Sequence, residues 1–114
     1  MKFSFKELDR EGFETLQSIA LADKFNDWMY QTIVRFCKGD ILEIGSGIGN
    51  ISEFLIKNKY NITLSDIRNN YCNYLRERFL GQENFKNIIN LDLVHPEFDS
   101  LYASWVASFN TVFA

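Results

Sequence analysis

The fold of this chain depends on residues 40–50, which read DILEIGSGIGN. The stretch begins with a short run of Ile and Leu, a pattern typical of a buried strand. Three glycines then follow at every second position: Gly45, Gly47 and Gly49. Glycine permits a positive φ and lacks the Cβ atom that would keep a ligand away from the backbone. The stretch therefore predicts a strand that ends in a ligand-binding turn.

Residues 50–58, which follow this turn, have the spacing of a helix with its apolar side chains on one face. Asn50 is placed to cap the first turn of this helix. Glu53 lies three residues further on, which is a capping-box arrangement with Asn in the Ser or Thr position. The start of such a helix offers a ligand free N–H groups and the positive end of the helix dipole.

The spacing of the glycines bears on which ligand the turn binds. A dinucleotide-binding turn reads G-x-G-x-x-G, and here Asn50 stands where that third glycine would be. A P-loop needs a Gly-Lys pair followed by Ser or Thr, which the stretch lacks. What remains is Glu-x-Gly-x-Gly-x-Gly, beginning at Glu43. A dinucleotide site and a glycine-rich turn without a ligand stay open as alternatives.

The Glu-x-Gly-x-Gly-x-Gly pattern resembles motif I of the class I S-adenosylmethionine (SAM) dependent methyltransferases, especially the small bacterial enzymes of the type 11 and type 12 kind. The resemblance implies an α/β, Rossmann-like fold with a mostly parallel sheet, strand order 3-2-1-4 and N-terminal helices. It also implies that the chain binds SAM and transfers its methyl group to an unidentified acceptor, leaving S-adenosylhomocysteine.

The rest of the chain predicts one domain over residues 1–114, with a helical segment at 1–38 and βα units at 39–114. Strands that alternate with helices indicate a parallel sheet. The helical segment has a possible break near Asp23 and a stop at Lys38-Gly39. After residue 58 we expect a strand ending at Asp66, a helix over 69–80, a strand over 85–91, a short helix over 97–107 and a strand over 109–114.

Aromatic residues in the N-terminal segment have helical spacing, and we interpret them mainly as core. The predicted core face includes Phe25, Trp28 and Phe36. In methyltransferases of this kind, a helix before the first strand packs on the sheet and can close over the cofactor. The resemblance therefore makes Phe25, Trp28 and Tyr30 candidates for such a lid.

Acidic residues occur at or near three predicted strand ends: Glu43, Asp66 and Asp92. Asp66 lies 19 residues after Gly47, the distance at which a nucleotide-binding fold places an acid on ribose hydroxyls. The resemblance implies that Asp66 binds the ribose and that Asp92 binds the adenine amino group. It also implies that Glu43 supports the glycine turn and the methionine amino end.

The implied cofactor site can be stated as one set. It contains Glu43, Gly45, Ser46, Gly47, Gly49, Asn50, Asp66, Ile67, Asp92 and Leu93. An acidic site suits SAM, which carries a sulfonium and an ammonium, whereas a dinucleotide brings a negative pyrophosphate. No residue is assigned a catalytic role, and we expect His95, which precedes a proline in a turn, to be structural or exposed.

Composition excludes several classes of function. A net charge of −3 and a pI near 5.1 argue against nucleic-acid binding driven by phosphate neutralisation. Cys37 and Cys72 lie 35 residues apart, which is neither a metal-ligand spacing nor a disulfide framework, so we expect reduced thiols. The sequence has no signal peptide and no apolar run of about 20 residues, so we expect a cytoplasmic protein without a membrane segment.

The resemblance runs from about residue 12 to the end of the chain but covers only the first half of the family's fold. We therefore expect the N-terminal part of a methyltransferase, whose acceptor site would lie beyond Ala114. A non-catalytic Rossmann-like binding or assembly module is the alternative. If the chain holds only the first half of the fold, the apolar strand at 109–114 lacks its second neighbour and leaves an open edge. We therefore expect a homodimer that covers this edge or the uncovered face of the sheet.

Overall fold

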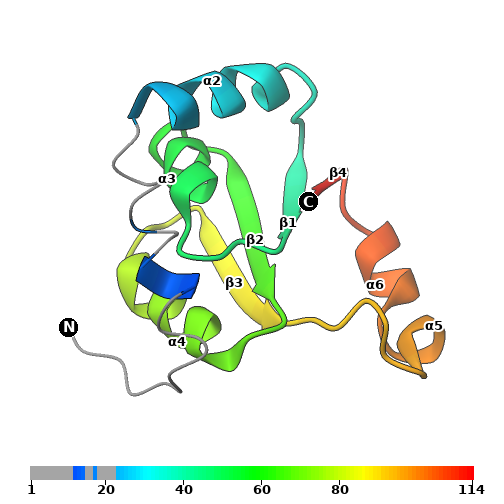
Figure 1. The fold of residues 1–114 in the computed structure, drawn as a ribbon. Coiled ribbons are helices and arrows are strands. Elements are labelled where there is room, and N and C mark those ends of the chain that lie inside the picture. The colour runs from blue at the N-terminus through cyan, green and yellow to red at the C-terminus, as the bar shows by residue number, and fades with distance from the viewer. Residues whose placement is uncertain (1–11, 15–16, 18–22) are drawn as a thin grey trace.

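A four-stranded, all-parallel sheet forms the centre of the molecule in the computed structural model, which describes residues 12–14, 17 and 23–114 (Figure 1). The strands are β1 (Asp40–Ile44), β2 (Asn61–Asp66), β3 (Phe85–Asn90) and β4 (Thr111–Phe113). Their spatial order is β3-β2-β1-β4. The predicted α/β class, parallel sheet and strand order are confirmed, and this arrangement is compatible with a Rossmann-like fold.

Three helices lie on one side of the sheet: α2 (Asp23–Val34), α3 (Asn50–Lys57) and α4 (Asn69–Arg78) (Figure 1). The connection from β3 to β4 lies on the other side and contains two short helices, α5 (Phe98–Leu101) and α6 (Ala103–Ala107). One helix was predicted for this connection. It is divided at Tyr102, whose φ of −129° is too extended for an α-helix.

The hydrophobic core lies between the sheet and the helices α3 and α4. It is built by alternate residues of the strands, since successive side chains of a strand point to opposite faces. Its buried members are Tyr30, Ile41, Leu55, Ile56, Ile62, Leu64, Cys72, Leu75, Phe79 and Ile88. By contrast, α5 and α6 contain no buried residue. The packing that positions the carboxyl ends of β1 and β2 therefore comes from the α3 and α4 side.

Helix α2 presents a different face to the core from the one predicted. Trp28 is 62% exposed and Phe25 and Phe36 are also exposed, whereas Tyr30 is 8% exposed and stacks on Phe54 of α3 with 5.2 Å between ring centroids. The reason is that α2 packs mainly against α3, so its contact stripe runs through Tyr30 and Val34, four residues apart. The core assignment of Phe25, Trp28 and Phe36 was therefore wrong.

Several predicted boundaries also move. α2 begins at Asp23, near the expected break, but ends at Val34, before the predicted stop. β3 ends at Asn90, so Asp92 lies in the turn beyond the strand. Most of the predicted helical segment before Asp23 lies outside the described residues.

Candidate functional site

The glycine turn between β1 and α3 has a compact, left-handed backbone. The φ angles of Gly45, Gly47 and Gly49 are 73°, 61° and 87°. The N–H of Ser46 donates to the carbonyl of Ser65 at 2.8 Å, and that of Gly49 donates to the carbonyl of Ser46 at 3.0 Å. The turn is thus bonded to the end of β2, and its conformation is one that side-chain-bearing residues rarely adopt.

Asp66 lies directly beside this turn. One of its carboxylate oxygens accepts the N–H of Gly47 at 3.0 Å, and the other accepts the N–H of Arg68 at 3.0 Å. The side chain is buried. Asp66 therefore joins the glycine turn to the start of the β2–α4 connection.

Glu43 is a buried carboxyl group on β1 that faces α3. Its Oε1 accepts a hydrogen bond from the Ser52 hydroxyl, in the first turn of α3. The pKa of Glu43 is raised to about 7, chiefly by burial; hydrogen bonds from the hydroxyls of Ser52 and Ser46 oppose this rise, and the charge of Asp66 adds to it. Near neutral pH, Glu43 therefore exists in both protonation states.

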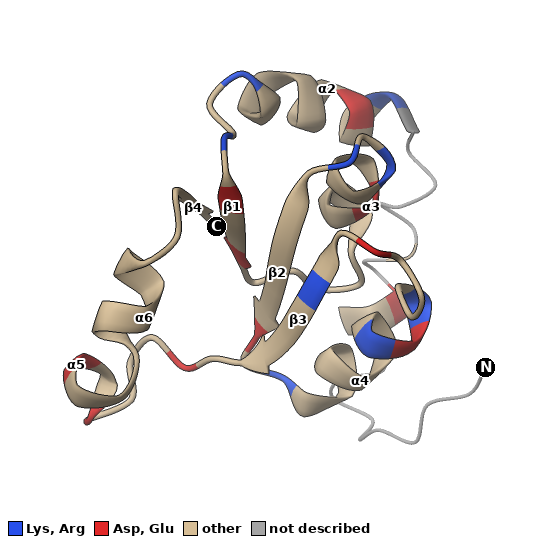
Figure 2. Ribbon diagram, turned by 180° about the vertical axis from the view of Figure 1, so that it is seen from behind, with Lys and Arg blue, Asp and Glu red and all other residues tan. Residues whose placement is uncertain are grey.

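Ser46 and Ser65 connect the glycine turn to the ends of β1 and β2. The N–H of Ser65 donates to the Ser46 hydroxyl oxygen at 3.2 Å, and the Ser65 hydroxyl donates to the carbonyl of Glu43 at 2.7 Å. Both serines are buried. Glu43, Ser46 and Asp66 thus lie around the glycine turn at the carboxyl ends of β1 and β2. Figure 2 shows acidic segments at these two strand ends and in the connection after β3.

Ile67, Asp92 and Leu93 lie on the segments that follow β2 and β3. Ile67 is 58% exposed and Leu93 is 48% exposed, so both offer apolar surface. The Asp92 carboxylate accepts the N–H of Val94 at 3.0 Å within its own turn. In the described part of the chain, no hydrogen bond joins Asp92 to the glycine turn. The structure therefore brings together the first two acids of the predicted site and leaves the third on a separate turn.

Gly49, and not Asn50, is the N-cap residue of α3, and no side-chain hydrogen bond caps the helix. A Cβ atom on Gly49 would lie 2.8 Å from the Phe79 ring and 3.0 Å from Leu75. Position 49 thus requires glycine, both for its left-handed φ of 87° and for its close packing against α4. Glu53 pairs with Arg78 and Lys57 instead of closing a capping box. The capping prediction was therefore wrong.

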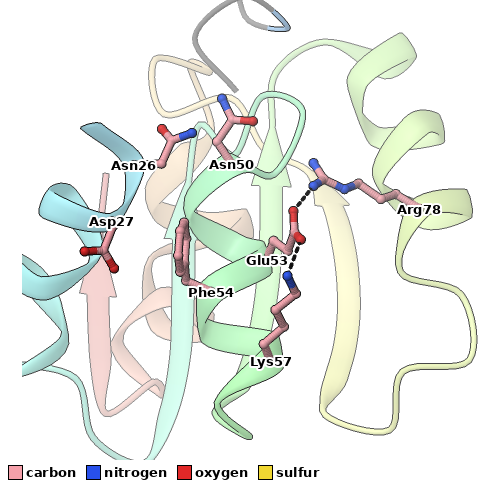
Figure 3. A pocket seen from close by; sticks show the side chains of 7 residues that line it. All are labelled: Asn26, Asp27, Asn50, Glu53, Phe54, Lys57 and Arg78. Carbon is pink, nitrogen blue, oxygen red and sulfur yellow. Dashed lines mark hydrogen bonds and ion pairs between the residues drawn. The ribbon is translucent and has the colours of Figure 1, made fainter. Parts of the chain in front are cut away.

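A cavity of about 390 Å³ opens between α2, α3 and α4 (Figure 3). It is lined by Asn26, Asp27, Asn50, Glu53, Phe54, Lys57 and Arg78. The Asn50 side chain thus belongs to the wall of this cavity, on the flank of α3. Gly45, Ser46, Gly47 and Asp66 do not line it.

Sequence reasoning missed three residues of the site. Ser52 and Ser65 contact Glu43, and Arg78 donates to the carbonyl of Ile48 in the glycine turn. Ser52 has a recognisable signal, since it is a polar residue on the inner side of an apolar helix start. Arg78 has none, because it lies 30 residues from Ile48 along the chain.

The described residues also bear on the requirements for a histidine site, a metal site and a membrane-spanning helix. His95 accepts the N–H of Glu97 through Nδ1 at 3.0 Å, which is the structural role expected for it. No group of three or more His, Cys, Asp or Glu residues within the described ranges is placed to hold a metal ion. Among the helices that the structure describes, none is both long and apolar enough to cross a membrane.

A scan against models of known protein families finds no match to this chain, and a search of curated proteins finds none either. The site's own residues are therefore the basis for assigning a function.

Proposed function

We propose that this chain binds SAM at the carboxyl ends of β1 and β2 and forms the cofactor-binding part of a methyltransferase with an unidentified acceptor. The proposal is supported first by the sequence resemblance of the glycine turn and of the segments at Asp66 and Asp92. It is supported second by the buried side chains of Glu43, Ser46 and Asp66, which lie at the glycine turn.

One observation favours SAM over a dinucleotide. A pyrophosphate site uses the free N–H groups of a glycine turn. In this turn the N–H groups of Ser46, Gly47 and Gly49 already donate to Ser65, Asp66 and Ser46, respectively. Two buried carboxyl groups, Glu43 and Asp66, lie at the turn, and an ionised carboxylate attracts the ammonium and sulfonium of SAM and repels a phosphate. With its N–H groups occupied and carboxyl groups beside it, the turn therefore suits a cationic ligand better than a phosphate.

Each residue of the proposed site would bind a different part of SAM. Asp66 would accept the ribose hydroxyls, Glu43 would face the methionine ammonium through the turn, and the exposed Ile67 and Leu93 would cover the adenine. Bound SAM supplies an already activated methyl group, so the chain's contribution is alignment and exclusion of water. Both cysteines are free thiols, which suits a reducing, cytoplasmic compartment.

Calorimetry with S-adenosylhomocysteine and NAD on the same protein tests the proposal. We expect S-adenosylhomocysteine to bind and NAD to bind at least about tenfold more weakly, a difference of about 1.4 kcal/mol. Tighter binding of NAD would overturn the assignment. Binding of S-adenosylhomocysteine without methyl transfer to any acceptor in a broad screen would favour the non-catalytic module.

Asp66→Ala tests the ribose contact within this proposal. The variant should weaken S-adenosylhomocysteine binding by about 1–3 kcal/mol, because charge-assisted hydrogen bonds are lost. It should also lower the free energy of unfolding, since the N–H groups of Gly47 and Arg68 lose their acceptor. Asp66→Asn is the matched control for stability, because it keeps one acceptor oxygen. An unchanged affinity in Asp66→Ala would place the ribose elsewhere.

A further inference from the structure

Arg78 connects the last turn of α4 to the glycine turn and to α3. One guanidinium nitrogen, Nη1, donates to the carbonyl of Ile48, and the other, Nη2, donates to Glu53 (Figure 3 shows the Glu53 contact). Ile48 lies between Gly47 and Gly49, the two residues with positive φ that form the end of the turn. A single side chain of α4 thus holds a backbone carbonyl within the predicted cofactor motif.

The end of α4 makes a second contact with the glycine turn, through Phe79. The Arg78 guanidinium lies over the Phe79 ring at 5.1 Å from its centroid, and this ring occupies the space beside Gly49. Only 24% of the Arg78 side chain is exposed. A planar guanidinium with fixed donors and a stacked ring beneath it has few other positions to adopt. The geometry of the Ile48 carbonyl is therefore set by a rigid contact.

Glu53 binds Arg78 and also has a second ion-pair partner. Its other carboxylate oxygen pairs with Lys57 at 2.8 Å. Lys57 and Arg78 together lower the pKa of Glu53, so Glu53 stays ionised at neutral pH. If Arg78 were removed, Glu53 would keep an ion pair on α3, whereas the Ile48 carbonyl would lose its donor. The distinctive contribution of Arg78 is therefore its bond to the glycine turn.

We propose that Arg78 is a positioning residue that holds the glycine turn in its binding conformation through the Ile48 carbonyl. Loss of this bond frees the Gly47–Gly49 segment to leave the left-handed conformation, which glycine does at little steric cost. The effect on turn geometry is independent of any ligand. Its effect on SAM affinity rests on the proposed function, because a turn that must be ordered on binding lowers affinity.

Two measurements on Arg78→Ala test the proposal, with Arg76→Ala as the matched control. Arg76 is also in the last turn of α4, but it donates to Asn73 on its own helix. Amide hydrogen exchange of Gly47 and Gly49 should accelerate about tenfold in Arg78→Ala, because one charge-assisted hydrogen bond to the turn is lost. It should stay unchanged in Arg76→Ala. S-adenosylhomocysteine affinity should fall by a similar factor in Arg78→Ala alone. Arg78→Lys, which keeps one donor, should restore part of both.

The outcomes separate this proposal from the assignment of the cofactor. Equal exchange rates at Gly47 and Gly49 in Arg78→Ala and Arg76→Ala would overturn the positioning role. If the unsubstituted protein fails to bind S-adenosylhomocysteine, the proposed function falls, but the exchange comparison still decides the role of Arg78. If Arg78→Ala does not fold, Arg78→Lys decides it: faster exchange confined to the glycine turn supports the role, and unchanged exchange contradicts it.

Discussion

Two carboxyl groups at the ends of neighbouring strands have different environments. Asp66 accepts two backbone N–H groups, from Gly47 and Arg68. Glu43 is buried and accepts a hydroxyl, and burial raises its pKa to about 7. A cationic ligand near Glu43 would favour the charged form and release a proton on binding. The difference between the two acids thus gives the site a measurable response to pH.

Glu43→Gln should change how stability depends on pH. The folded protein keeps the Glu43 proton up to a pKa of about 7, while the unfolded chain releases it near 4.5. The stabilisation is complete below pH 4.5 and is lost as the pH rises through about 7. The free energy of unfolding, measured with urea, should therefore decline across this pH window by up to about 3 kcal/mol, and Glu43→Gln should remove this decline.

Glu53→Gln is the control for this measurement. The pKa of Glu53 is lowered, chiefly by its bond to Lys57, so its removal should leave the decline between pH 4.5 and 7 in place. A decline that survives in Glu43→Gln would show that another group causes it.

The glycine turn and the helices around it depend on one another. Gly49 is the site where α3 starts against Phe79 of α4, and Tyr30 joins α2 to α3 by stacking on Phe54. Helices α2 and α4 therefore both pack against α3. The position of the predicted cofactor motif is set by this packing as much as by the sheet.

Gly49→Ala should destabilise the protein more than Gly45→Ala. Both positions have a positive φ, and each alanine pays about 1–2 kcal/mol for that conformation. A Cβ on Gly45 meets no atom within 4 Å, but one on Gly49 lies 2.8 Å from Phe79. Overpacking should add about 1–3 kcal/mol at Gly49 only. Equal losses in chemical denaturation would mean that α3 and α4 move apart easily.

Tyr30→Ala and Trp28→Ala distinguish the two faces of α2. Tyr30 is buried against Phe54, and its loss should cost about 3–5 kcal/mol, as for other large buried aromatics. Trp28 is exposed, and its loss should change stability by no more than about 0.5 kcal/mol. The two unfolding curves provide the measurement. A Trp28→Ala variant of normal stability but weaker S-adenosylhomocysteine binding would support the lid expected from the resemblance.

Contacts between segments about 70 residues apart complete the sheet. The N–H of Asp40 donates to Asn110 at 2.9 Å, and that of Lys38 donates to Thr111 at 2.9 Å, so the start of β1 is tied to the start of β4. β4 in turn has one neighbour in the described sheet, β1. Its Val112 side chain is 41% exposed. The β4 edge, like the β3 edge at the other side of the sheet, is therefore open to the addition of another strand.

We expect the protein to form a two-fold dimer through the β4 edge, because the backbone groups on that side of β4 have no partner strand among those that the structure describes. Val112→Lys should shift sedimentation at micromolar concentration towards the monomer, because a charge on an edge strand disfavours pairing. Leu80→Lys, at an exposed position after α4, adds the same charge away from the edge and should leave the association unchanged. A monomeric unsubstituted protein would contradict the prediction.

Local sequence patterns predicted the parts of this protein that depend on neighbouring residues. The apolar run before Gly45 became β1, the positions with positive φ became the glycine turn, and Asp66 ended β2 beside that turn. The alternation of strands and helices, with the order implied by the resemblance, became the 3-2-1-4 sheet. Backbone preferences and the periods of strands and helices are short-range properties, so they can be deduced from the chain alone.

Packing decided the rest, because its partners are distant in sequence. The buried face of α2 followed from its contact with α3, and the need for glycine at the N-cap of α3 followed in part from Phe79, which leaves no room for a side chain there. The bond from Arg78 to Ile48 spans 30 residues and has no local signature. An amphipathic pattern shows that a helix has an apolar face, but only the neighbouring helix determines which residues that face buries.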